Sequence, residues 1–416
     1  MRRKVLFSIL FLLPFMLLFP PSVYSQGYYV VDEATAGNFF VVGARALGMG
    51  GACIAVVTDA TALVYNPAGL ARVTRIEFSG SLTHQRMNNK TRSGFYPQQD
   101  GRLLNNTRFS SANVVLPVPT YRGSLVLALG VNRVKSFDKT MQFSFKGEGV
   151  GYSERGIESE SGGIYLWSFG AAIDVSPNVS VGGALNLWSG KDNYTWLYEK
   201  TYLVQRTKYD DTIKDRYSGF NAKFGVRIQP NKYLIIGGTI ESPVTYTIKE
   251  DWTEITETDQ ESYYNYGSSE YKISLPFSLG AGVALQVNNL TLAGDINYTD
   301  WTQMEYKRLE DMAEANRQIK DTYSDVLRFH LGAEFLIPQI GTSLRAGFYR
   351  NPLPYKSRWI KKDRNFFTAG IGFLIDQVMT LDIAWAHGSW ELQDFTPDLT
   401  EKYTTDQIFL SVAYRL

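Results

Sequence analysis

The feature that most constrains the fold is an alternation of large apolar residues with small or polar ones, which recurs from Thr74 to the end of the chain. Successive side chains of a β-strand point to opposite faces, so a period of two predicts strands whose two faces meet different surroundings. A soluble sandwich and a membrane barrel both fit this pattern. One segment places seven apolar side chains on a single face: Leu275, Phe277, Leu279, Ala281, Val283, Leu285 and Val287.

The links between these segments separate the two alternatives. Tight links alternate with links of about 12–27 polar residues, and short turns at one end with long loops at the other are typical of outer-membrane barrels. We therefore predict an all-β fold: a 14-stranded antiparallel transmembrane β-barrel with periplasmic termini and extracellular long loops. The expected strands are 74–86, 107–117, 123–135, 162–175, 179–197, 216–229, 233–250, 269–287, 290–307, 325–337, 342–350, 364–375, 379–391 and 404–416.

The two ends of the chain agree with export to the outer membrane. Residues 2–4 are basic, residues 5–19 form an apolar run and a cleavage position follows, which predicts a signal peptide over residues 1–25. No later segment reaches the roughly 18–20 apolar residues of a spanning helix. The last strand alternates up to Leu416 and resembles the strand by which the barrel-assembly machinery recognises such proteins. We expect the outer membrane of a Gram-negative cell, with lipid bilayer and lipopolysaccharide around the barrel.

The segment 26–73 between the signal peptide and the first strand does not alternate and is rich in small residues. A phosphate loop is excluded, because no Lys-Ser/Thr pair follows the glycines and no strand precedes them. Glycines allow close backbone packing in a confined space. We expect this segment to fold into the lumen of the barrel 74–416 as a hatch that plugs it.

The stretch 43–70 resembles the N-terminal hatch of the FadL/TodX family of outer-membrane transporters for long-chain fatty acids and aromatic hydrocarbons. The residues that carry the resemblance, and with it a hatch or gating role, are Gly48, Gly50, Gly51, Asn66, Pro67 and Ala68. The resemblance implies passive uptake of a hydrophobic compound, which leaves through a lateral opening at the third strand. Leu416 in place of a terminal aromatic residue and the free Cys53 depart from the family pattern.

Other classes of function compete with transport. The attachment and shuttle barrels of type IX protein secretion also resemble this family, which would make exported proteins the partners. This alternative stays open, as does a porin or structural barrel of undefined role. The 42 Lys and Arg balance 41 Asp and Glu, so the basic excess of a nucleic-acid-binding protein is missing. One Cys excludes a disulfide framework, and three His with no G-x-S-x-G motif give no indication of an enzyme. We expect no cofactor and no metal.

Three local predictions follow. For the lateral opening we expect interrupted strand pairing at Gly130 and Asn132, since a glycine inside a strand often marks a bulge. Residues 305–320 are rich in helix formers and predict a short extracellular helix with Leu309, Met312, Asn316 and Ile319 on one face. We expect this apolar face to cap the lumen mouth or to form part of an outer ligand groove. If the large apolar residues face lipid, a polar network that holds the hatch lies in the lumen: Lys223, Arg227, Glu241, Asp295, Arg328, His330, Glu334, Arg345 and Asp382.

Overall fold

The computed structural model describes residues 40–93, 99–121, 123–147, 151–307, 313–356, 360–393 and 399–416. The expected signal peptide and residues 26–39 of the expected hatch lie outside the described residues. The strands are β1 (Glu77–Ser93), β2 (Gln99–Val118), β3 (Leu125–Ser136), β4 (Lys139–Gly147), β5 (Tyr152–Ser176), β6 (Val179–Tyr202), β7 (Gln205–Ile228), β8 (Leu234–Glu241), β9 (Val244–Thr258), β10 (Ser262–Leu275), β11 (Ser278–Val287), β12 (Leu290–Asp300), β13 (Glu305–Lys307), β14 (Asp325–Ile337), β15 (Thr342–Arg350), β16 (Ile360–Ile375), β17 (Met379–Gln393) and β18 (Leu399–Arg415).

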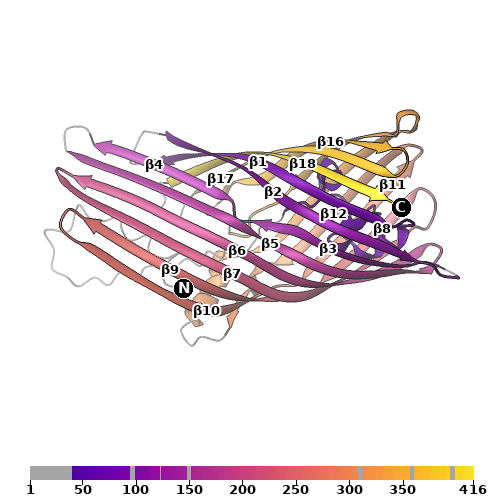
Figure 1. Ribbon diagram of the computed structural model, residues 1–416, viewed down its shortest axis with the longest axis horizontal. Coiled ribbons are helices and arrows are strands. Elements are labelled where there is room, and N and C mark those ends of the chain that lie inside the picture. Colours follow the sequence, from indigo (N-terminus) through magenta and orange to yellow (C-terminus); the bar gives the residue numbers. More distant parts are fainter. Residues whose placement is uncertain are drawn as a thin grey trace.

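All strand pairs are antiparallel, and pairing of β1 with β18 closes the sheet into a barrel (Figure 1). Four pairs of strands continue one another along the wall, namely β3 with β4, β8 with β9, β10 with β11, and β12 with β13. Counted this way, the wall consists of 14 strands. The predicted 14-stranded antiparallel barrel is therefore confirmed.

The two ends of the barrel differ. At the end that we call the turn end, links are short, such as Pro177–Asn178 between β5 and β6, as the sequence predicted. At the opposite end, the hairpin end, the expected long loop 198–215 is wrong, because β6 and β7 continue as a hairpin that turns at Leu203–Val204. Most residues of this stretch are polar, although Tyr198 and Ile213 are buried, so the apolar alternation stops while the backbone pairing goes on.

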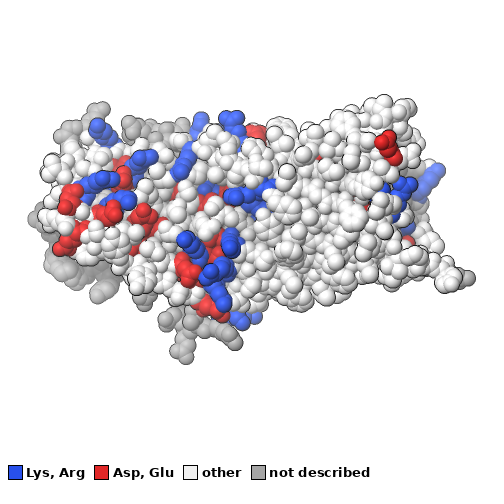
Figure 2. Space-filling model, in the orientation of Figure 1, with Lys and Arg blue, Asp and Glu red and all other residues white. Residues whose placement is uncertain are grey.

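The outer surface carries an apolar belt. Leu279, Val283 and Leu285 of β11 point outward and are 42–49% exposed. Figure 2 shows that Lys, Arg, Asp and Glu gather toward the hairpin end and, in smaller number, at the turn end, with a broad uncharged belt between them. This distribution fits a wall that faces lipid. Among the described residues, no helix is both long and apolar enough to cross a membrane.

Two neighbouring strands of the wall switch faces halfway along. In β8, Ile236 and Ile240 point outward, whereas beyond Pro243 the side chains of Val244, Tyr246 and Ile248 are buried inside. The same switch occurs at Pro276, between Leu275 inside and Leu279 outside. The prediction that Leu275 shares an outward face with Leu279 is therefore wrong, because the proline interrupts the strand and shifts its side-chain parity.

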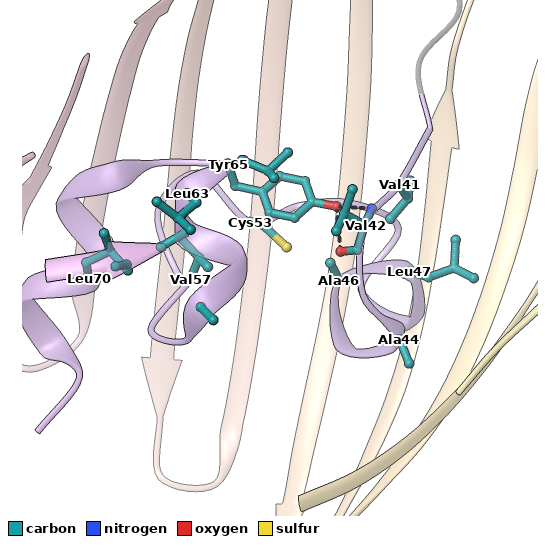
Figure 3. Packing of buried hydrophobic residues seen from close by; sticks show 14 of the residues in the cluster. Val41, Val42, Ala44, Ala46, Leu47, Cys53, Val57, Leu63, Tyr65 and Leu70 are labelled. Atoms are coloured by element: carbon teal, nitrogen blue, oxygen red, sulfur yellow. Dashed lines mark hydrogen bonds between the residues drawn. The ribbon is translucent and has the colours of Figure 1, made fainter. Parts of the chain in front are cut away.

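The segment after Phe40 occupies the lumen near the turn end. It contains the short helix α1 (Ala44–Gly48) and two 3₁₀ turns, η3 (Ala60–Leu63) and η4 (Pro67–Arg72). Helix α1 packs on β16 and β17, and η4 packs on β5 and β6. The apolar side chains of the segment after Phe40 form a buried cluster in which the Tyr65 hydroxyl bonds to the backbone of Val42 (Figure 3). We refer to residues 40–73 as the hatch segment.

Candidate functional site

The glycines of the hatch segment lie against the backbone of the barrel wall. Gly50 has a φ of 61°, and a Cβ there would lie 2.5 Å from the Leu331 carbonyl oxygen. Gly51 has a φ of 75° and touches the His330 ring, while Gly48 lies against the Arg345 side chain. These three positions let α1 end directly against the strands.

The Asn66-Pro67-Ala68 motif ties the hatch segment to itself and to the wall. The Asn66 side chain accepts a hydrogen bond from the Ala68 amide at 3.1 Å, which caps η4, and Pro67 starts the turn. The side-chain amide of Asn66 also donates to the Ile54 carbonyl at 2.7 Å and to the Val226 carbonyl of β7 at 3.0 Å. Asn66 and Ala68 are fully buried.

A chain of alternating charges holds α1 to the wall. The Arg45 guanidinium of α1 lies 3.1 Å from the Glu334 carboxylate of β14 and 3.4 Å from Asp59. Glu334 is 2.6 Å from Arg345 of β15, which in turn is 2.6 Å from Asp382 of β17. Three lumen residues expected from the sequence are thus joined to the hatch segment through Arg45, which the sequence reasoning missed.

Three further lumen residues contact the hatch segment directly. The Lys223 ammonium donates to the Val64 carbonyl at 2.6 Å, and His330 Nδ1 lies 2.8 Å from the Gly50 carbonyl. The Asp295 carboxylate accepts from the amides of Cys53 and Ile54 at 2.5 and 2.8 Å. Of the remaining expected residues, Glu241 pairs with Lys223 at 3.0 Å, Arg227 donates to Gln229 at 3.2 Å, and Arg328 lines the cavity described next.

Above the hatch segment, toward the hairpin end, lies a cavity of about 160 Å³. Phe40, Ile54 and Val64 form its floor. Its wall carries the polar Lys223, Glu241 and Arg328 beside an apolar group made of Leu166, Trp188, Val244, Tyr246, Leu275 and Trp301. Val244 and Tyr246 follow the face switch at Pro243, and Leu275 precedes the switch at Pro276. The switches therefore direct into the lumen apolar side chains that strict alternation would direct to lipid.

Aromatic rings give this cavity a defined shape. The Trp188 and Tyr246 rings meet edge to face with centroids 5.7 Å apart, and Tyr217 meets Tyr246 at 6.1 Å. The Trp188 indole donates to Asn221 at 2.8 Å, so its polar atom is satisfied and its ring stays available for packing. The Lys135 ammonium lies 5.8 Å from the Trp301 ring centroid. The site offers aromatic faces and edges to an apolar ligand.

A helix closes the cluster of apolar residues around the cavity. Helix α2 (Ala313–Thr322) buries Ala315 and Ile319 there, and Asn316 exchanges hydrogen bonds of 2.7 and 2.8 Å with the backbone of Tyr306. The predicted helix 305–320 is therefore misplaced at its start, because Glu305–Lys307 pairs with β10 as strand β13. Leu309 and Met312 lie outside the described residues.

The wall beside the cavity is interrupted between β2 and the strand formed by β3 and β4. Gly130 pairs with Asn113 on one side and Ser168 on the other, so the interruption predicted at Gly130 is wrong in position. Asn132 is buried, donates to Asn113 at 2.9 Å, and is the last residue of β3 that pairs with β2. Residues 99–109 of β2 pair with β1 on one side and with no other strand of the described chain on the other side.

Ion pairs bridge this interruption. Asp138, between β3 and β4, lies 2.6 Å from Arg108 of β2 and 2.6 Å from the buried Arg133. A register shift between Arg133 and Lys135 turns the end of β3 toward the lumen, and Lys135 lines the cavity. The sequence analysis did not identify these residues, although the change in side-chain alternation after Asn132 could have revealed the register shift.

Comparison with known proteins assigns the family. A model of outer membrane protein transport proteins (OMPP1/FadL/TodX) matches residues 26–406. The chain belongs to this family. Its members are outer-membrane transport proteins. Separately, the residues that the structure describes include no group of three or more His, Cys, Asp or Glu that could hold a metal ion. No curated relative matches the chain.

Solved structures of the family share the fold at low identity. A Pseudomonas aeruginosa FadL homologue is 12% identical with a TM-score of 0.63, over 91% of this chain and 99% of that one. The P. putida toluene transporter TodX is 13% identical with a TM-score of 0.62, over 90% and 98%. The Ralstonia pickettii toluene transporter TbuX is 14% identical with a TM-score of 0.59, over 90% and 98%.

Proposed function

We propose that this protein carries small hydrophobic compounds passively across the outer membrane, and that monoaromatic hydrocarbons fit it better than long-chain fatty acids. The observation that supports this choice is the cavity of about 160 Å³ above the hatch segment, whose lining combines aromatic side chains with charged and polar ones. An apolar cavity of roughly 150 Å³ holds one benzene, whereas drug-sized ligands occupy about 300 Å³ or more. The family supports transport, and TodX and TbuX, described as toluene transporters, support the ligand class.

The proposed route runs from the hairpin end to the wall. We place the hairpin end outside the cell and the turn end, with the chain's C-terminus, in the periplasm, as expected for a barrel assembled by the barrel-assembly machinery. A ligand enters between the hairpins, past the lipopolysaccharide layer, and settles in the cavity. It leaves through the interruption between β2 and β3, which the cavity approaches at Val134 and Lys135. Transfer of an apolar molecule into the bilayer is favourable, so no energy source is needed.

The hatch segment acts in this proposal as the gate that prevents leakage. Asn66, Pro67, Ala68 and the glycines fix its closed position, and a ligand that binds a shifted hatch more tightly drives the opening. The alternative of a type IX secretion component receives no support from the solved structures compared, which are described as transporters and hydrocarbon channels. The proposal contains no catalytic step.

Binding and uptake of toluene test the proposal. Purified protein is expected to bind toluene more tightly than oleate, and cells that make it are expected to take up labelled toluene faster than cells without it. Trp188→Ala removes an edge of the cavity and is expected to lower both at least about tenfold, since truncating a buried aromatic costs ~3 kcal/mol or more of packing. Trp167→Ala is the matched control, because Trp167 faces outward. Equal uptake with and without the protein refutes transport, and tighter binding of oleate refutes the ligand class.

A further inference from the structure

The hairpin formed by β9 and β10 leaves one strand edge open at the hairpin end. Strand β10 pairs with β9 along its whole length, but on its other side only Lys272–Ser274 pair, with β13. The edge of Ser262–Glu270 therefore has no strand partner in the described part of the chain. At ~3.3 Å per residue this open edge is about 30 Å long.

The open edge lacks the features that normally protect one. Proteins protect their edges with lysine, proline, bulges or very short strands. Residues 262–270 contain no Lys, Arg or Pro, and their register with β9 runs without a shift. Their single charged residue, Glu270, lies 3.6 Å from Lys249 of β9. The edge is a regular template to which another strand can add.

Exposed tyrosine side chains project from both faces of β10 beside this edge. Tyr263, Tyr264 and Tyr266 are 59%, 67% and 80% exposed, although they sit on a paired strand. In Figure 1 the two strands run together toward the hairpin end of the barrel. Tyrosine is enriched at protein interfaces because its ring buries a large area and its hydroxyl still bonds.

The charge of the hairpin selects the partner. Residues 249–270 contain seven Asp and Glu but one Lys. Arg216 and Lys208 of β7 pair with Asp251 and Glu257, which leaves the hairpin negative. A second copy of this chain would bring two negative hairpins together, and like charges at that distance repel. A cationic segment is attracted instead, and its Lys or Arg side chains can stack on the tyrosine rings.

We propose that the β10 edge at Ser262–Glu270 binds an extended, Lys- and Arg-rich segment of another cell-surface protein by strand addition. Main-chain hydrogen bonds to the open edge supply affinity, and the acidic hairpin with its tyrosines supplies specificity. The site is distinct from the ligand cavity and does not depend on the proposed transport function.

Peptide binding to the full-length purified protein tests the site. The probes are a nine-residue peptide of alternating Thr and Lys, the same peptide with Glu for Lys, and the Lys peptide with a central proline. The Lys peptide is expected to bind at least about tenfold more tightly than either of the others. Hydrogen exchange is expected to slow at backbone amides within residues 262–270 when it binds.

The double variant Tyr264→Lys/Tyr266→Lys is expected to weaken binding of the Lys peptide at least about tenfold, because added lysines repel it and block the edge. Tyr233→Lys at the turn end is the matched control, since Tyr233 is 48% exposed. Equal affinity for the three peptides, no protection of residues 262–270, or self-association through this edge in sedimentation overturns the proposal. Toluene uptake is expected to be unchanged in the double variant, so failure of this site and failure of transport are distinguishable.

Discussion

The Asn66→Ala variant gives the sharpest test of how the hatch segment is held. The substitution removes hydrogen bonds of 2.7, 3.0 and 3.1 Å, to the Ile54 carbonyl, the Val226 carbonyl and the Ala68 amide. At about 1 kcal/mol each, these bonds sum to about 3 kcal/mol. Local unfolding of the hatch segment breaks all three bonds, and ~1.4 kcal/mol corresponds to a factor of ten, so opening by this route is expected to increase about a hundredfold.

Cys53 reports this opening without any engineered label, because it is the only cysteine of the chain. It is buried in the hatch segment, and burial, followed by the nearby Asp295 carboxylate, raises the pKa of its thiol. A maleimide therefore reacts with it only after the hatch segment opens. The labelling rate is measured on folded protein of the wild type, Asn66→Ala and Asn178→Ala, in which the replaced side chain is exposed. Equal rates for wild type and Asn66→Ala refute the reasoning.

Three other perturbations test the hatch contacts and the proposed exit. Glu334→Gln leaves the guanidinium groups of Arg45 and Arg345 without their shared carboxylate. It is expected to weaken hatch docking by about 3 kcal/mol, which is measured as faster labelling of Cys53. An unchanged labelling rate contradicts this prediction. Gly225→Ala places a Cβ 1.9 Å from the Asn66 side chain and is expected to cost about 1–3 kcal/mol in the same assay. Gly183→Ala is expected to cost less, because the nearest atom to its Cβ belongs to the Phe224 ring at 3.3 Å. Arg108→Cys/Asp138→Cys, with the native cysteine replaced, is expected to lose toluene uptake when a cleavable linker joins the two thiols and to regain it on cleavage; uptake that persists in the linked protein excludes exit between β2 and β3.

The sequence predicted the wall of the barrel better than its lumen. Alternation and tight links located the strands and the turns at one end, because lipid on one face and a polar lumen on the other impose a period of two. The period of two fails as a guide where the strands no longer have lipid on one face. Residues 198–215 are mostly polar and their apolar residues do not alternate, so this stretch looked like a loop although its backbone pairs.

The candidate site shows the same division. Lys223, Asp295, His330 and Glu334 could be assigned to the lumen by parity alone, and each contacts the hatch segment in the structure. Their partners could not be assigned, because hatch contacts join residues up to hundreds of positions apart. Arg45, for example, reaches Glu334 across 289 positions of the chain.

By itself, the sequence determined that this protein is an all-β barrel with a small-residue segment before its first strand, because those properties follow from local periodicity and composition. Only the tertiary structure decided where the ligand cavity lies. Prolines 243 and 276 each shift one strand's parity, but a cavity forms because the two strands are neighbours in the wall and switch at the same level. Strand adjacency and level are set by long-range pairing, which no local pattern of residues specifies.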